Sequence, residues 1–84
     1  MLTEKGRADR EALVTIQREL NLSATEARVA LAVSRGLDSQ QISNLHGVSV
    51  NTVRSQLRSI FGKTGARNKV QLVLLLFRLI GFRG

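Results

Sequence analysis

Residues 38–63 read DSQQISNLHGVSVNTVRSQLRSIFGK, and this stretch decides the fold. Its apolar residues recur at helical spacing on both sides of Gly47, which predicts one helix over residues 39–46 and a second from residue 50 to about residue 62 or 63. Asp38 and Ser49 are suited to cap the starts of these helices. Gly47 supplies the positive φ that a short turn between two crossed helices requires. The stretch therefore predicts two helices joined by a sharp turn.

Each of these helices has an expected buried side. In the first, Ile42 and Leu45 are predicted to face the core, and the small side chain of Ser43 allows the next helix to pass close by. The second helix is expected to be held to the core by Val53, Leu57, Ile60 and Phe61.

The opposite side of the second helix is polar and carries no acidic residue. Arg54 and Arg58 are four residues apart and so lie along one face. Such a helix fits the major groove of DNA, where an arginine can donate two parallel hydrogen bonds to guanine O6 and N7. Ser55 is short and lets the backbone approach the base edges. From the residues alone, Arg54 and Arg58 can address neighbouring base pairs or flanking phosphates.

Polar groups beside this face are expected to contact phosphates, which sets the register of a protein on the duplex. On the second helix these groups are Asn51, Thr52 and Gln56. The amides near Ser39 and Gln40, at the start of the first helix, form a second natural phosphate site.

The charge distribution points to an anionic partner. The formal net charge is +7 over 84 residues. Every Asp and Glu lies at or before Asp38, and residues 39–84 carry only Arg and Lys as charged side chains. This favours nucleic acid or an acidic membrane. The alternative is that the basic charge only keeps a small protein soluble.

Three more helices complete an all-α prediction for one small domain: residues 8–20, 24–35 and 68–81. Ser23 and Glu26 have the spacing of a capping box at the start of the 24–35 helix. Gly36 is placed to end that helix.

The 68–81 helix is apolar nearly all round, although one buried face needs only about three apolar positions in seven. We expect Leu72, Val73 and Leu76 to pack inward. Val70, Leu74 and Phe77 then form a second stripe, for which a two-fold homodimer is the expected cover. A dimer would place two groove helices on half-sites about one DNA turn apart. The alternative is that the first helix or a further domain covers this stripe.

Taken together, the motifs over residues 22–76 resemble the LuxR/GerE-type helix-turn-helix family of bacterial transcriptional regulators. The match preserves residue type and spacing at Leu22-Ser23-x-x-Glu26, Gly36-Leu37, Ile42, Gly47-Val48-Ser49, Thr52-Val53-Arg54, Ile60-Phe61-x-Lys63 and Gly65-x-x-Asn68-Lys69. The resemblance implies a four-helix DNA-binding domain without a wing over residues 22–84, ending in a dimerisation helix. Residues 1–21 would be an additional N-terminal helix or the remnant of a linker.

By position, the resemblance makes residues 50–63 the helix that enters the major groove. It also places Arg54, Ser55 and Arg58 where family members touch bases. The remaining residues expected at the DNA backbone are Ser49, Lys63, Arg67 and Lys69. Departures from the family pattern include His46, where Leu is usual, and Leu72, where Ala is common.

Several chemistries are not expected. The chain has no Cys, which excludes disulfides and thiolate metal sites. His46 is the only His and is read as a boundary residue, so we predict no metal and no cofactor. The sequence contains no nucleophile–base set and no phosphate-cradling Gly loop, so an enzyme is not expected. The polar N-terminus is no secretory signal, and the C-terminal apolar run is too short to span a bilayer, so a cytoplasmic, nucleoid-associated protein without a membrane partner is expected.

The function predicted is sequence-specific binding of double-stranded DNA to regulate transcription, as a homodimer, with RNA polymerase as a further candidate partner. One alternative is a sigma-factor-like promoter-reading domain, which would not need a dimer surface. Another is a helical protein-interaction adaptor that does not bind DNA. The chain is expected to be either a piece of a larger sensor-regulator or a single-domain regulator.

Overall fold

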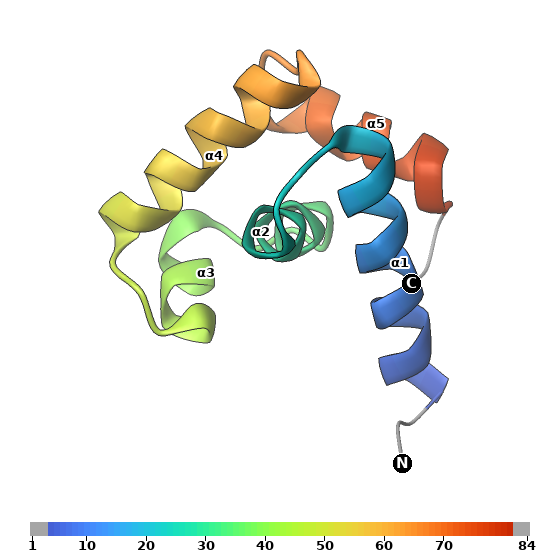
Figure 1. Cartoon of the computed structure of the whole chain (residues 1–84). Coiled ribbons are helices and arrows are strands. Elements are labelled where there is room, and N and C mark those ends of the chain that lie inside the picture. Colours follow the sequence, from blue (N-terminus) through green and yellow to red (C-terminus); the bar gives the residue numbers. More distant parts are fainter. Residues whose placement is uncertain (1–3, 82–84) are drawn as a thin grey trace.

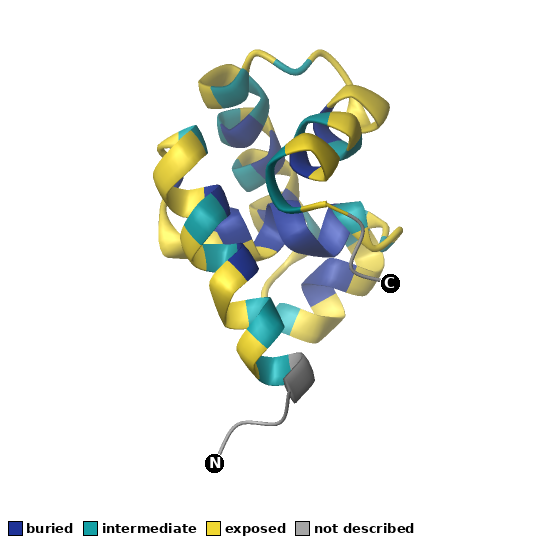
Figure 2. Cartoon of the chain, turned by 90° about the vertical axis from the view of Figure 1, so that its right-hand side faces the viewer, coloured by how far each residue is buried: buried dark blue, intermediate teal, exposed yellow. Residues whose placement is uncertain are grey.

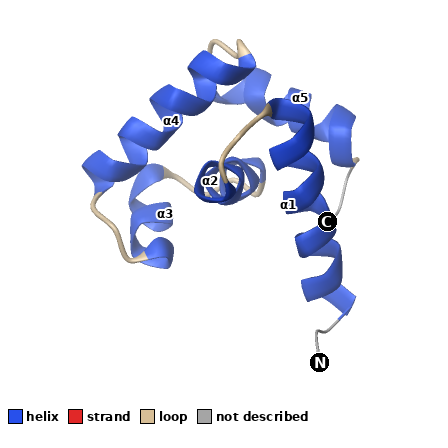
Figure 3. Ribbon diagram, viewed as in Figure 1, coloured by secondary structure: helices blue, strands red, loops and turns tan. Residues whose placement is uncertain are grey.

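The computed structural model describes residues 4–81, which fold into five helices with no strand among them (Figures 1 and 3). The helices are α1 (Glu4–Leu20), α2 (Ala24–Ser34), α3 (Ser39–His46), α4 (Val50–Thr64) and α5 (Lys69–Ile80). The all-α prediction is confirmed. The predicted N-terminal segment spans residues 1–21 and the predicted DNA-binding domain spans residues 22–84. Residues 1–3 of the first and residues 82–84 of the second lie outside the described residues.

Helix α2 is the centre of the molecule. It contacts α1, α4 and α5, while α3 packs on α4 and α1 also packs on α5. Figure 1 shows α2 end-on in the middle, with the other helices around it. Its small side chains, such as Ala27 and Ala30, are fully buried and allow neighbouring helices to come close. In Figure 2 the buried residues of the surrounding helices face this centre and the exposed ones lie outside.

Local capping chemistry fixes most of the helix boundaries. Capping boxes are present at Ser23 with Glu26 and at Asp38 with Gln41, as predicted. At the start of α4, the Ser49 hydroxyl accepts the Thr52 N–H at 3.1 Å. The boundary of α1 differs most from the prediction, since it begins at Glu4 rather than near residue 8.

The turn between α3 and α4 depends on a glycine. Gly47 has a φ of 68°, in the left-handed region that a residue with a Cβ rarely adopts. Its N–H donates to the Ser43 carbonyl and so ends α3. This turn sets the crossing of the two helices and confirms the role predicted for Gly47.

The prediction that Leu45 faces the core is wrong, because its side chain is 66% exposed. Helix α3 approaches the core through Ile42 and Ser43, which are both buried. These neighbours are about 100° apart around the helix, so the buried face is centred between them. Leu45 points more than a quarter-turn away from that centre. It lies instead on a groove shared with residues of α1 and α2.

Helix α5 is divided into an inward and an outward side, as predicted. Leu72 and Leu76 are buried and Val73 is half-buried. On the other side, Val70, Leu74 and Phe77 are 67%, 55% and 48% exposed. Within residues 4–81, no helix is both long enough and apolar enough to cross a bilayer.

Candidate nucleic-acid interface

Most of the polar side of α4 faces solvent. Val53, Leu57 and Ile60 are buried against the core, which fixes which side of the helix points outward. Arg54 and Arg58 are exposed, as is Ser55 between them. Among residues 4–81, neither guanidinium takes part in an ion pair. The three residues predicted to contact bases therefore lie together on one accessible face.

The first turn of α4 adds further polar groups beside this face. Asn51 and Thr52 are exposed there. The Ser49 hydroxyl lies 3.0 Å from the Thr52 hydroxyl and also caps the helix, so it is already committed to local hydrogen bonds. The positive end of the α4 dipole points out at the same turn and favours a phosphate there.

The start of α3 is less open to a phosphate than the sequence suggested. The Asp38 carboxylate accepts the Gln41 N–H at 2.8 Å, so an anion already occupies this helix end. Ser39 is half-buried, and the Gln40 side-chain amide donates to Ser43 and Asn44 of its own helix. A phosphate at this end would therefore meet the charge of Asp38.

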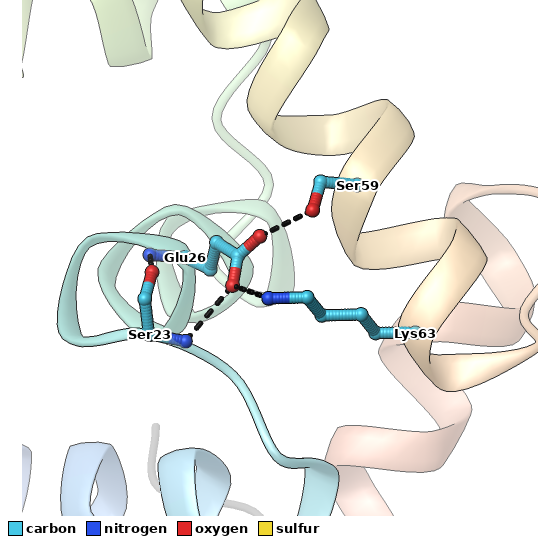
Figure 4. A network of polar contacts seen from close by, with 4 residues as sticks. All are labelled: Ser23, Glu26, Ser59 and Lys63. Atoms are coloured by element: carbon cyan, nitrogen blue, oxygen red, sulfur yellow. Dashed lines mark hydrogen bonds and ion pairs between the residues drawn. The ribbon is translucent and has the colours of Figure 1, made fainter.

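A buried carboxylate joins the N-terminus of α2 to α4 (Figure 4). Glu26 is 7% exposed. Its Oε1 accepts the Ser23 N–H at 2.8 Å and the Lys63 Nζ at 2.7 Å. Its Oε2 accepts the hydroxyl of Ser59. Lys63, predicted to contact phosphate, thus has its ammonium group on a carboxylate of its own chain.

The hydrogen bonds at this junction keep Glu26 ionised. The hydrogen bond from Lys63, with those from the Ser23 N–H and the Ser59 hydroxyl, lowers the pKa of Glu26 from 4.5 to about 2, against the opposing effect of burial. The junction is therefore an ion pair at neutral pH, with little net charge of its own.

Beside the junction lies a polar hollow of about 440 Å³ between α2 and α4. It is lined by Ser23, Thr25, Glu26, Thr52, Ser55, Gln56, Ser59 and Lys63. Gln56 is half-buried, and its Oε1 is shielded from solvent without a hydrogen-bond partner among the described residues. If Gln56 contacts a phosphate as predicted, its Nε2 must be the donor to the phosphate oxygen.

The last two predicted phosphate contacts lie beyond α4. Arg67 is exposed in the loop after α4, and Lys69 is exposed in the first turn of α5. The backbone N–H of Arg67 donates to the Gln71 side chain at 2.7 Å, which leaves the guanidinium clear of that contact.

His46, the only histidine, lies half-buried at the end of α3. Burial, with the positive charge of Arg28, lowers the pKa of His46 below 6.5. The described residues contain no cluster of three or more His, Asp or Glu side chains that could hold a metal ion.

The cross-helix role of Glu26 was missed by the sequence interpretation. Its capping box with Ser23 fully explained the residue within four positions, so nothing local required a partner more than thirty residues away. Ser59 looked like part of the solvated side of α4, but its position next to Glu26 depends on how α2 and α4 pack. The sequence did contain a signal for this partnership. Glu26 is the single acidic residue of α2, and the charged residues of 39–84 are all Arg or Lys.

Comparison with known proteins agrees with this geometry. The chain is 39% identical over 57 residues to "Transcriptional regulatory protein YdfI" of Bacillus subtilis (strain 168), a match that covers 68% of this chain and 27% of that protein. The chain thus spans about a quarter of that relative's length. No solved structure gives a significant match. Residues 20–76 match the GerE family, described as bacterial regulatory proteins of the luxR family. With most of its length inside that match, and with a helix-turn-helix at its centre, the chain belongs to the luxR family of bacterial regulatory proteins.

Proposed function

We propose that this chain binds double-stranded DNA in a sequence-specific manner and thereby regulates transcription, with α4 in the major groove. The observation that carries the proposal is the accessible, acid-free face of α4, on which Arg54 and Arg58 lie beside Ser55 without an ion pair to any of residues 4–81. An arginine held this way can pair with guanine O6 and N7. The family and the name of the relative support the same role.

Phosphate contacts around α4 would fix its register on the duplex. The exposed groups best placed for this are Asn51, Thr52, Arg67 and Lys69. The Asp38 carboxylate at the start of α3 makes Ser39 and Gln40 weaker candidates. Lys63, already paired with Glu26, is also a weaker one.

We also propose that the chain acts as a homodimer through α5. The support is the exposed stripe of Val70, Leu74 and Phe77 on a helix whose other side is buried. An apolar groove of about 350 Å³ runs beside it, where Val33 and Leu37 of the neighbouring segments meet α5. A symmetric pair would cover this surface and present two copies of α4 to two half-sites.

Selection of bound duplexes from a random library tests the proposal. The expected result is enrichment of a defined half-site, repeated as a palindrome if the chain binds as a dimer. Gel shifts on the selected duplex should show Arg54→Ala and Arg58→Ala each weakening binding about 5- to 100-fold, in line with the loss of one bidentate base contact. Arg18→Ala, on the exposed side of α1, is the control that removes the same charge elsewhere.

Three outcomes would argue against the proposal or a part of it. Equal losses from all three arginine substitutions would argue against α4 as the reading helix. Absence of any shift at low salt would favour an adaptor that binds protein only. A monomeric mass on the selected duplex, with a half-site that is not repeated, would favour the sigma-factor-like alternative.

A further inference from the structure

We propose that Glu26 is the positioning residue for the DNA-reading helix: it sets the rotation of α4 about its own axis and withholds the charge of Lys63 from DNA. This inference rests on the proposed function, since it assigns the means by which the base-reading face is aimed. It makes Lys63 a structural partner of Glu26 rather than a phosphate contact.

Ser59 and Lys63 are four residues apart, so they lie on one stripe of α4. Both are bound by the same carboxylate, Ser59 at Oε2 and Lys63 at Oε1 (Figure 4). Two attachment points on one stripe, made to one rigid group, resist rolling of the helix in either direction.

The stripe of Ser59 and Lys63 lies at a fixed angle from the face that carries Arg54 and Arg58. Arg54 and Arg58 immediately precede Ser55 and Ser59, so the arginine stripe lies about 100° around the helix from the bound stripe. Any roll of α4 therefore turns the arginines by the same angle. A guanidinium that must form two parallel hydrogen bonds to a base tolerates little misdirection.

Glu26 is itself held firmly in place. The carboxylate sits at the capping box of α2, where it accepts the Ser23 N–H at 2.8 Å, and α2 is packed by three other helices. The side chain is almost fully buried. The reference point for α4 is thus the most enclosed helix of the fold.

Lys63 Nζ lies 2.7 Å from Glu26 Oε1, so the pair contributes almost no net charge to the DNA-facing side. Removal of the carboxylate alone would leave Lys63 as an unpaired cation near the end of α4. A freed cation adds sequence-independent attraction to any duplex, together with the release of one more counterion.

The test compares three variants on two duplexes, the one selected by the wild-type chain and a random one, over a series of salt concentrations. Glu26→Gln keeps the shape of the side chain but removes its charge. Asp9→Asn is the matched control, because it removes the same charge and breaks the Asp9–Arg35 ion pair, which lies between α1 and α2. Glu26→Gln/Lys63→Gln removes the whole pair and leaves the net charge at its wild-type value.

The expected results separate positioning from stability. Glu26→Gln should lower the ratio of specific to random affinity about tenfold, the size of one lost base contact, while random binding becomes tighter. The slope of log affinity against log salt should steepen by about 0.9. Asp9→Asn should leave the affinity ratio at the wild-type value. The double variant should lose the ratio as Glu26→Gln does, with an unchanged salt slope on random duplex.

Other results would overturn the inference. If Glu26→Gln weakened binding to both duplexes in the same proportion, Glu26 would only stabilise the fold. A double-variant slope shallower than wild type by about 0.9 would show that Lys63 contacts a phosphate. Circular dichroism and thermal unfolding identify the folded fraction of each variant, and the double variant is decisive should Glu26→Gln not fold. Failure of the wild-type chain and of Asp9→Asn to bind DNA would instead refute the proposed function.

Discussion

The carboxylate of Glu26 connects the start of α2 to α4 through hydrogen bonds at both of its oxygens. It has two roles. It is the reciprocal partner in the α2 capping box, and it accepts hydrogen bonds from two side chains of α4. Because it is buried, the loss of its partners would leave an unpaired charge out of water. Its effect on stability should therefore depend on whether it is ionised.

Acid should weaken the fold through this residue. The pKa of Glu26 is lowered from 4.5 to about 2, so between these values the unfolded chain binds more protons than the folded one. The stability from this ion pair is then fully present above pH 4.5 and is lost as the pH falls toward 2. With allowance for solvent screening, we expect Glu26→Gln to cost about 1–2 kcal/mol at pH 7 and much less near pH 2.

Urea unfolding at several pH values, followed by circular dichroism, measures this difference. Lys63→Met removes the other partner and should reduce the pH dependence in the same interval. Parallel loss of stability by the wild type and Glu26→Gln between pH 5 and pH 2 would show that the junction is not the acid-sensitive group.

At the scale of elements, the turn between α3 and α4 depends on the backbone conformation of one residue rather than on a side-chain contact. Gly47 has a φ of 68°, and a Cβ built there meets nothing within 4 Å. Gly62 lies inside α4 with an ordinary helical φ, and a Cβ there also meets nothing within 4 Å. The two glycines therefore differ in backbone strain and not in available space.

Opposite effects are expected when each glycine is changed to alanine. Gly47→Ala should destabilise the fold by about 1 kcal/mol, because an L-residue is strained in the left-handed region. Gly62→Ala should stabilise it by about 0.5–1 kcal/mol through higher helix propensity. Chemical denaturation of both variants gives the two free energies, and a shift of the same sign in both would contradict this account of the turn.

Helices and caps were predictable from sequence because their causes are local. The capping residues Ser23, Asp38 and Ser49 each act within three positions, and all three begin a helix at the predicted point. The placement of Leu45 was not predictable in the same way, since it depends on which side of a two-turn helix meets α4. The same is true of Lys63, whose partner is set by tertiary packing. The accessible face of α4 followed from its acid-free pattern, whereas its anchoring on α2 did not.

At the scale of the whole molecule, the described residues present two distinct surfaces. One is the cationic side of α4, and the other is the apolar side of α5. These two helices pack on the same central helix, so their relative placement is fixed by the core of one chain. If the chain pairs through α5 as proposed, this placement would determine the separation of the two copies of α4.

Charged substitutions in the α5 stripe should abolish the proposed pairing. Val70→Asp with Leu74→Asp should halve the mass in sedimentation equilibrium, because burial of two carboxylates at a symmetric contact is strongly unfavourable. Val14→Asp is the control, since Val14 is also an exposed aliphatic residue, 47% exposed, on α1. A wild-type chain that is monomeric at every concentration would contradict the dimer, as would a mass unaffected by the double substitution.

The enclosure of α2 has a consequence for how the sequence can vary. Most of α2 is covered by neighbouring helices, and Ala27 and Ala30 have no exposed area at all. An added methylene at either position must displace one of three neighbouring helices. In a saturation library, Ala27 and Ala30 should therefore be among the least replaceable residues of this domain. The exposed arginines of α4 could be exchanged at little structural cost.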